Sequence, residues 1–246
     1  MPTISVIIPC LNEEKYLGLL LDDLVVQASQ PDEVIVADCA SKDKTIAVAE
    51  SYKSKLPIKI VHSRTRSAAA ARNEGAEASS GEYLLFIDAD MRIPKNTVSR
   101  MKKSLASHPV DYLTPAYKSD GMSFADRVSV WFVMRMMNLN MKLLHRAFGI
   151  GGVMCVKSSK HKEVDGFNES LNTYDDMDYI QRLRRARTDF TYLHDLTTVT
   201  SSRRFEGHSW PVALLILLGE NSKPAQWTLQ PLLKKIGKHR KYGHYE

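Results

Sequence analysis

The chain has 246 residues, of which 43% are hydrophobic and 25% are charged, and its formal net charge is +6. This composition is typical of a globular protein and argues against a disordered, collagen-like or disulfide-scaffold chain. The 3 cysteines lie far apart without a CxxC pair, so they give no zinc signature, and their odd number argues against a secreted disulfide framework. We therefore expect a reducing, cytoplasmic compartment.

The positive charge is concentrated toward the C-terminus. From Tyr179 onward the chain carries 12 Lys/Arg and 5 Asp/Glu, a net charge of +7, whereas the preceding part carries 22 and 23, a net charge of −1. This asymmetry predicts an anionic partner for the C-terminal part, such as a phosphate-bearing substrate, a lipid headgroup or nucleic acid. We expect neither a signal peptide nor a membrane span, because no suitable apolar segment is present.

Strand and helix patterns alternate through the first 90 residues. Short β-branched or apolar runs predict strands, and runs with apolar residues at helical spacing predict helices between them. The expected strands are 3–9, stopped by Pro9, and 33–38, 58–62 and 83–87, and the expected helices are 13–28, 43–54 and 67–79. This rhythm predicts βαβ units, and therefore an α/β fold with a mostly parallel central sheet flanked by helices.

The alternation becomes less regular after residue 90. Strands are expected at 110–117 and 153–156, and helices at 94–106, 175–187 and 208–218. A methionine-rich segment at 124–148 suits an adaptable apolar surface, but a core helix pair or an oligomer interface explains it better than a membrane contact does. The basic tail at 234–241 is compatible with anionic lipid or with plain solvation.

The first candidate site is Asp88-Ala89-Asp90, which directly follows the apolar run YLLFI. In an extended segment, residues two apart point the same way, so both carboxylates can share one side at the carboxyl edge of a parallel sheet. Ligands bind at that edge in open α/β folds. Two hard oxygen ligands with open positions suit Mg²⁺ or Mn²⁺ shared with a diphosphate. The alternative is that both aspartates only cap the following turn.

The second candidate site is the acidic run DDMD at 175–178, which begins a helix. The helix dipole favours acidic residues in a first turn, with Thr173 as the N-cap, so capping accounts for part of the pattern. Three acids in four positions exceed what capping needs, and an ionised carboxylate there can act as a general base. A third, weaker candidate is Asp38 at the end of the second strand, where a ribose or base can bind, although aspartate is also a common turn residue.

Four segments, taken together and in this order, resemble family 2 glycosyltransferases with the GT-A fold. They are VIIPCLNEE at 6–14, VADCASKDKT at 36–45, AARNEGAEASSGEYLLFIDAD at 70–90 and VDGFNESLNTYDDMDYIQRL at 164–183. In the second segment Ala37 and Cys39 depart from the family pattern, whereas Asp38 and Asp43 retain its two acidic positions. In the fourth segment Asp175 stands where the family usually has Glu, and Asp176 falls on the position of the family's catalytic base.

The resemblance implies an inverting, metal-dependent glycosyltransferase with a Rossmann-like nucleotide-binding half. It implies that Asp176 is the catalytic base, and that Asp88 and Asp90 hold Mn²⁺ or Mg²⁺, with Asp90 as the main ligand. The metal would offset the charge on the leaving nucleotide diphosphate. The donor-binding residues that it implies are Pro9, Asn12, Glu14, Asp38, Arg72 and Asp88.

Three basic residues near the C-terminus have two interpretations each. The pair Arg203-Arg204 can clamp a diphosphate by bidentate hydrogen bonds, or it is a solvated surface pair. Basic residues follow the catalytic segment in many members of the resembled family, which favours the diphosphate clamp and adds both arginines to the donor-binding set. His208 can supply a metal ligand, but a lone histidine is more often an ordinary polar residue.

We expect a single GT-A domain in three parts. Residues 1–90 form the nucleotide-sugar-binding half, 91–205 the acceptor and catalytic half, and 206–246 a basic, helical C-terminal extension. The acceptor is a soluble glycan or a lipid-linked carrier, which leaves open a peripheral contact with the inner face of the membrane. An oligomer is also left open.

Three other functions fit the sequence less well. A non-catalytic GT-A-like protein that binds a nucleotide sugar or a membrane surface should have lost an acid at the metal or base position, and this chain keeps both. A nucleic-acid-binding protein is suggested only by the sequence pI of about 9.1, and the basic segments lack base-stacking aromatic residues, so we expect no nucleic acid. A sugar nucleotidyltransferase would show a Gly-rich phosphate loop after its first strand, and PCLNEE contains no glycine.

Overall fold

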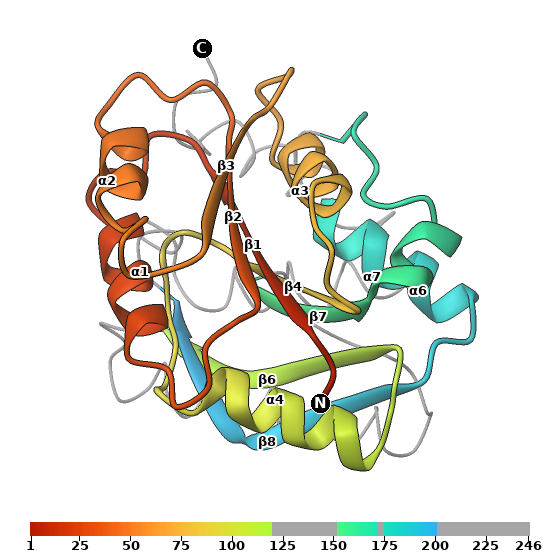
Figure 1. Ribbon diagram of the computed structural model, residues 1–246. Helices are drawn as coiled ribbons and strands as arrows, with labels where there is room; N and C mark the ends of the chain where they lie inside the picture. The colour runs from red at the N-terminus through yellow and green to blue at the C-terminus, as the bar shows by residue number, and fades with distance from the viewer. Residues whose placement is uncertain (120–151, 172–174, 201–246) are drawn as a thin grey trace. The chain divides into compact units, whose positions relative to one another are not determined.

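The computed structural model describes residues 1–119, 152–171 and 175–200 (Figure 1). These residues belong to one compact unit, Met1–Asp120 with Asn140–Ser201, and a second unit, Gly121–Leu139 with Ser202–Glu246, lies outside them. The segments 124–148, 208–218 and 234–241 therefore lie outside the described residues, as do Thr173, Arg203, Arg204 and His208. The single-domain organisation and its three parts stay a prediction.

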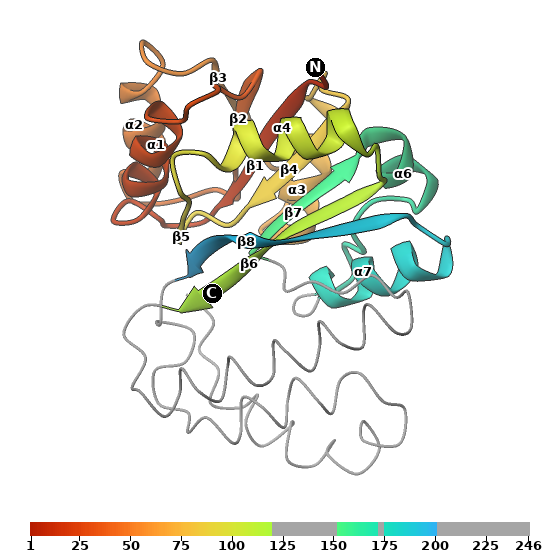
Figure 2. The same ribbon diagram turned by 90° about the horizontal axis from the view of Figure 1, so that it is seen from below.

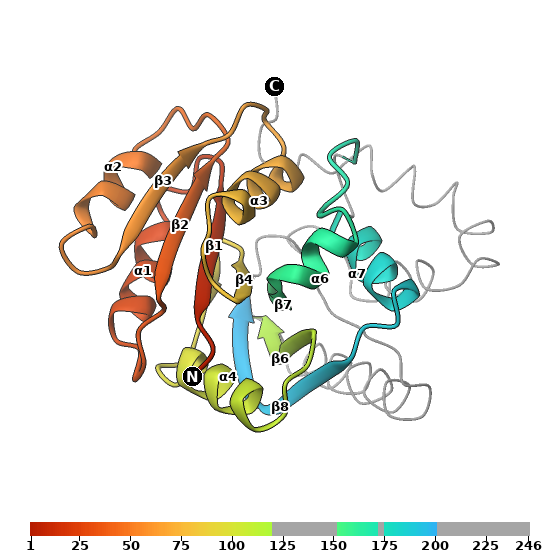
Figure 3. The ribbon, with the colours of Figure 1, turned by 45° about the vertical axis from the view of Figure 1, so that its right-hand side comes forward.

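The described elements form one sheet with helices on both faces (Figures 1 and 3). The strands are β1 (Ile4–Cys10), β2 (Glu33–Asp38), β3 (Ile58–His62), β4 (Tyr83–Ile87), β5 (Met91–Arg92), β6 (Tyr112–Ser119), β7 (Val153–Lys157) and β8 (Phe190–Thr200). The helices are α1 (Leu17–Val25), α2 (Thr45–Ser51), α3 (Ala68–Glu77), α4 (Thr97–Ser107), α6 (Ser158–Glu163) and α7 (Asp175–Arg185).

The sheet has the order β3-β2-β1-β4-β7-β6-β8-β5. The first four strands in this order are parallel, which confirms the βαβ units that the sequence predicts. β7 is antiparallel to β4 and β6, whereas β6 and β8 run parallel side by side, as Figure 2 shows. The result is a mixed, mostly parallel sheet, as expected.

The strands bury opposite faces against different helices because successive side chains alternate. One core cluster joins Val6 of β1 and Leu85 of β4 to α1 and α4. The other joins Ile7 and Phe86, the next residues of the same strands, to α3 and α7. Each such fully buried apolar side chain contributes about 1.5–3 kcal/mol of transfer free energy. α1 and α3 thus cover opposite faces, so the crossover side changes between β1 and β4 (Figure 3).

Pro9 does not stop the first strand, as the sequence suggested, because β1 continues to Cys10. The pairing of β1 with β4 ends at Ile7, opposite Phe86, whereas the pairing with β2 continues to Cys10. The Cys10 carbonyl faces β2 and accepts the Cys39 N–H, so the backbone of Pro9 faces the β4 side. Proline is tolerated there because β4 has already diverged and no ladder hydrogen bond is lost.

The helices within the first 90 residues are shorter than expected, and the sequence analysis missed three elements. The expected helix at 13–28 begins only at Leu17 and ends at Val25, and the Glu13 N–H before it donates to the Thr45 hydroxyl at 2.7 Å. The missed elements are β5, α6 and β8. Within the described residues, no helix has both the length and the hydropathy needed to cross a bilayer.

Candidate active site

The chain turns directly after β4, at Asp88. The Asp88 N–H donates to the Gly152 carbonyl at 3.0 Å, and the Met91 N–H donates back to the Asp88 carbonyl at 3.0 Å. Asp88 and Asp90 therefore occupy a β-turn, and the extended arrangement expected for them is wrong. Aspartate is favoured at the first position of such turns. Both residues are only 6% exposed, which is more burial than turn formation requires.

Arg72 of α3 connects this turn to the start of α7. Its Nη2 lies 2.7 Å from Oδ1 of Asp88, and its Nη1 lies 2.5 Å from Oδ2 of Asp175. Burial alone would lower the pKa of the guanidinium, but the charges of Asp88, Asp175 and Asp176 raise it above its ordinary value. Arg72 therefore stays charged and brings the two acidic segments together across the interior.

Asp176 lies half-buried beside this ion-pair network. Its own Oδ1 accepts the Met177 N–H at 2.8 Å. Burial raises the pKa of the carboxyl, and the negative charges of Asp175 and Asp88 raise it further, whereas Arg72 opposes the rise. The expectation that the helix dipole simply keeps Asp176 ionised is thus incomplete. A raised pKa makes Asp176 a better general base than an ordinary aspartate, because a general base is most effective when its pKa lies close to the working pH.

The network has an excess of negative charge. When Asp176 is ionised, the three carboxylates of Asp88, Asp175 and Asp176 face one guanidinium, so three negative charges and one positive charge leave a net charge of −2. Among the side chains that the structure describes, no group of three or more His, Cys, Asp or Glu residues is arranged as a metal site.

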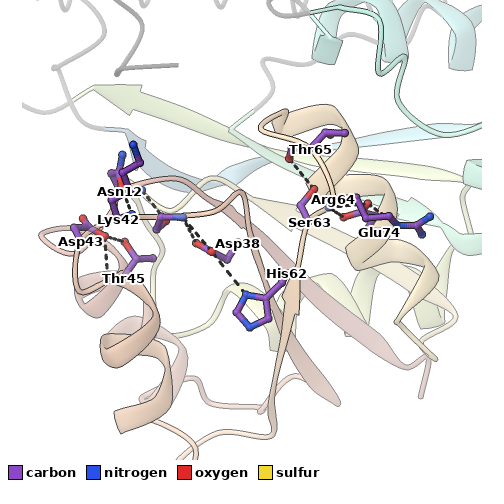
Figure 4. A network of polar contacts seen from close by, with 11 residues as sticks. Asn12, Asp38, Lys42, Asp43, Thr45, His62, Ser63, Arg64, Thr65 and Glu74 are labelled. Carbon is purple, nitrogen blue, oxygen red and sulfur yellow. Dashed lines mark hydrogen bonds and ion pairs between the residues drawn. The ribbon is translucent and has the colours of Figure 1, made fainter. Parts of the chain in front are cut away.

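The loops after β1 and β2 are joined to each other at the same edge of the sheet (Figure 4). Oδ1 of Asn12 accepts the Lys42 N–H at 2.8 Å, and Oε2 of Glu14 accepts the Lys44 N–H at 3.0 Å. Asn12 has a φ of 55°, in the left-handed region that asparagine tolerates better than most residues. In this structure both side chains hold the second loop against the first.

Asp38 ends β2 and is 2% exposed. Its two carboxylate oxygens accept the Ser41 N–H at 3.1 and 3.3 Å, and the His62 Nδ1 lies 3.9 Å from one of them (Figure 4). This is the turn-forming role that the sequence left as an alternative. Contact of Asp38 with a ribose or base stays a prediction, as does contact of the half-buried Pro9 with a donor.

The sequence-predicted residues thus fall into two groups at the carboxyl edge of the parallel strands. Arg72, Asp88 and Asp176 come together around one charge network, and Asn12, Glu14 and Asp38 build the loops after β1 and β2. Sequence reasoning missed the contribution of Asp175, which holds Arg72. The signal was available in the acidic run at 175–178, but Asp175 was interpreted only by its place before the base.

Comparison with known proteins places the chain among glycosyltransferases. The family described as glycosyl transferase family 2 matches residues 5–165. The poly(ribitol-phosphate) beta-N-acetylglucosaminyltransferase TarS of Staphylococcus aureus is 35% identical over 117 residues, which are 46% of this chain and 20% of TarS. An uncharacterized glycosyltransferase of Haemophilus influenzae is 24% identical over 188 residues, which are 73% of this chain and 61% of that protein. This chain therefore spans only about a fifth of TarS.

Solved structures share the fold. S. aureus TarS 1–349 in complex with UDP-GlcNAc has a TM-score of 0.68 at 23% identity, covering 90% of this chain and 67% of that one. The mannosyltransferase PcManGT of Pyrobaculum calidifontis, in complex with GDP-Man and Mn²⁺, has a TM-score of 0.68 at 20% identity, covering 92% and 67%. The expected GT-A fold is confirmed, and the chain belongs to glycosyl transferase family 2.

Proposed function

We propose that this chain transfers a sugar from a nucleotide-sugar donor to an acceptor hydroxyl, with inversion at the anomeric carbon. The observation that carries the proposal is the placement of Asp176, a half-buried carboxylate of raised pKa, beside the Asp88–Asp90 turn at the carboxyl edge of a GT-A sheet. Arg72 connects the two acidic segments. Family membership and the UDP-GlcNAc bound to the TarS structure support the same reaction class.

Asp176 acts as the base in this reaction. It removes the proton from the acceptor hydroxyl while that oxygen forms a bond to the anomeric carbon. The bond from the anomeric carbon to the diphosphate oxygen breaks, and its electron pair leaves with the nucleotide diphosphate. One displacement from the opposite face inverts the anomeric centre, so a single base suffices.

The leaving diphosphate needs a positive charge, and the residues at the turn fit a divalent cation. The available donors are hard carboxylate oxygens, which Mg²⁺ and Mn²⁺ prefer, and the network has negative charge to spare. We assign Asp90 as the principal ligand, as the family resemblance implies, and Asp88, whose Oδ1 is bonded to Arg72, as the second. When bound, the cation would offset charge on the departing diphosphate. The Mn²⁺ in the PcManGT structure is compatible with this assignment.

The donor occupies the edge formed by the loops after β1 and β2. Pro9 and Asp38 stand at the ends of these strands, and Asn12 and Glu14 shape the loop wall through their hydrogen bonds to the second loop. Arg72 provides fixed positive charge within the site. Arg203 and Arg204, outside the described residues, complete the proposed diphosphate clamp.

The acceptor is a glycan or a lipid-linked carrier with anionic character. The basic C-terminal third supports this choice, and TarS is named for a poly(ribitol-phosphate) acceptor. A lipid-linked acceptor would place the protein at the inner face of the membrane. The alternative, a non-catalytic protein that binds a nucleotide sugar or a membrane surface, predicts donor binding without turnover.

A thermal-shift panel of UDP-, GDP- and dTDP-sugars, with and without Mn²⁺, tests the proposal. A ligand that binds only the folded protein must raise its stability. We expect one nucleotide class to shift the unfolding temperature in a metal-dependent way, and Asp90→Ala to remove that shift. Absence of any shift from a folded sample would contradict donor binding, and a shift without release of nucleotide diphosphate would favour the non-catalytic alternative.

A further inference from the structure

The residue after Arg72 holds a different part of the catalytic segment. Oδ1 of Asn73 accepts the Phe167 N–H at 2.7 Å, and Nδ2 of Asn73 donates to the Phe167 carbonyl at 2.9 Å. One side-chain amide thus satisfies both main-chain groups of Phe167, in the way that a neighbouring strand would. Nδ2 also reaches the exposed Glu169 carboxylate at 2.8 Å. These bonds attach the loop between α6 and α7 to α3.

The backbone before Phe167 is shaped for this contact. Gly166 has a φ of +57°, a conformation that other residues rarely adopt. A Cβ at Gly166 would lie 2.6 Å from Oδ1 of Asn73, so the close approach also requires glycine. We call Asn73, Gly166 and Phe167 the Asn73 clamp.

The ring of Phe167 connects the clamp to the proposed site by packing against residues on both sides of it. It is 2% exposed and stacks on Tyr179 of α7, with ring centroids 4.0 Å apart and planes 22° apart. It also meets Phe86 of β4 edge-on at 5.0 Å, and the guanidinium carbon of Arg72 lies 5.3 Å from its centroid. Phe167 therefore contacts the helix that carries Asp176, the strand that leads to Asp88 and the arginine between them.

We propose that Asn73 is a positioning residue for the transfer reaction, because through Phe167 it sets where α7 stands relative to the turn after β4. This inference rests on the proposed function for its catalytic consequence, but the clamp itself is independent of it. Asn73 touches no reacting atom, so its loss should misplace the base while leaving the donor loops of Asn12 and Glu14 intact. A misplacement of about 1 Å can cost on the order of a hundredfold in rate.

The test compares Asn73→Ala with Asn168→Ala. Asn168 lies in the same loop, but among the described residues its side chain bonds only to Ser170, two residues away. We expect Asn73→Ala to lower kcat about tenfold or more and to change the donor KM by less than about twofold, because transition-state placement is lost and donor binding is kept. Asn168→Ala should match the wild type in both constants. A smaller fraction of folded protein would also lower the apparent kcat at constant KM, so kcat is calculated per mole of folded protein, measured on the same samples.

A second measurement needs no activity. Hydrogen exchange of the 175–185 amides should be about tenfold faster in Asn73→Ala than in Asn168→Ala, because α7 loses its support. If Asn73→Ala does not fold, Asn73→Ser and Phe167→Leu remove part of the same contacts and should show smaller changes in the same direction. Wild-type kcat together with wild-type exchange in these variants would overturn the proposal. A wild-type chain that transfers no sugar would contradict the proposed function, and the exchange comparison would still decide the clamp.

Discussion

Nη1 of Arg72 lies 2.5 Å from Oδ2 of Asp175, although the two residues are 103 positions apart in the chain. The same guanidinium binds Asp88 through Nη2 at 2.7 Å. One buried side chain thus connects the turn that follows β4 with the helix that begins at Asp175. This charge holds the segment that begins at Asp175 to the first 90 residues of the chain, so Arg72 has a structural role beside the proposed contact with a donor.

Removing that charge should be costly. Arg72→Met leaves Asp88, Asp175 and Asp176 close together without their cation, and breaking a buried ion pair in this way costs about 3–5 kcal/mol. The matched control is Arg92→Met, because Arg92 pairs with Asp23 at 2.7 Å but is about half exposed, and exposed pairs contribute roughly 0–1 kcal/mol. Urea unfolding measures both changes. Equal losses in the two variants would contradict the importance of burial at Arg72.

Asp176→Asn should stabilise the folded protein. The folded pKa of Asp176 is raised, so the folded state prefers the protonated form, and ionising the carboxyl destabilises the fold as pH rises above the unfolded value of about 3.9. An amide has no such penalty. We expect a higher unfolding temperature for the variant at pH 7 and a smaller difference at pH 4. A lower unfolding temperature at pH 7 would show that the carboxylate is stabilising instead.

His161 should make the fold sensitive to mild acid. It is 7% exposed, its Nδ1 lies 2.8 Å from the Tyr179 hydroxyl, and burial, together with Arg182 and Lys162, lowers its pKa from 6.5 to about 4. The unfolded chain therefore binds the proton first, and stability is lost as pH falls from about 6.5 toward 4. Between pH 7 and pH 5 this amounts to about 2 kcal/mol.

The measurement for His161 is urea unfolding of the wild type and His161→Gln at pH 7 and pH 5. The variant has no imidazole to protonate, so its stability should change less between the two pH values. Identical pH dependence of the two proteins would show that His161 does not titrate differently in the folded and unfolded states.

Two helical glycines should respond oppositely to alanine. A Cβ at Gly75 of α3 would lie 2.6 Å from Cγ2 of the buried Ile7, whereas a Cβ at Gly18 of α1 would be 3.6 Å from its nearest neighbour, Val48. Overpacking at Gly75 should cost about 1–3 kcal/mol, partly offset by helix propensity. At Gly18 the propensity gain of up to about 1 kcal/mol should remain. Thermal unfolding of both variants checks the signs, and a stabilised Gly75→Ala would contradict the close packing of α3 on β1.

The sequence predicted β1, β2 and β4 because most of their side chains are apolar, and they are buried on both faces of the sheet. β4, with YLLFI buried throughout, matches its expected bounds. β8 was missed because FTYLHDLTTVT is polar and lacks alternation. β8 is held instead by hydrogen bonds to its parallel partner β6, with a register shift between Pro115 and Ala116. A pairing between strands so far apart in the chain cannot be predicted from the local sequence pattern.

The site was predictable to a similar degree. The acidic runs at 88–90 and 175–178 can be recognised as candidate sites from residue type and spacing in the sequence alone. The turn at Asp88 depends on a hydrogen bond to Gly152, and the bridge from Arg72 to Asp175 depends on folding across the interior. Such contacts come from tertiary structure, so the sequence indicated Arg72, Asp88 and Asp176 but not the contacts between them or the role of Asp175.

The measurement that tests the central claim most directly is single-turnover sugar transfer by Asp176→Asn, with donor affinity measured on the same sample. The asparagine keeps the size of the side chain and cannot accept the hydroxyl proton. We predict donor affinity within about twofold of the wild type and a transfer rate lower by at least about a hundredfold, because general base catalysis contributes about 10²–10⁴ in rate. A transfer rate equal to that of the wild type would contradict the assignment of Asp176 as the base.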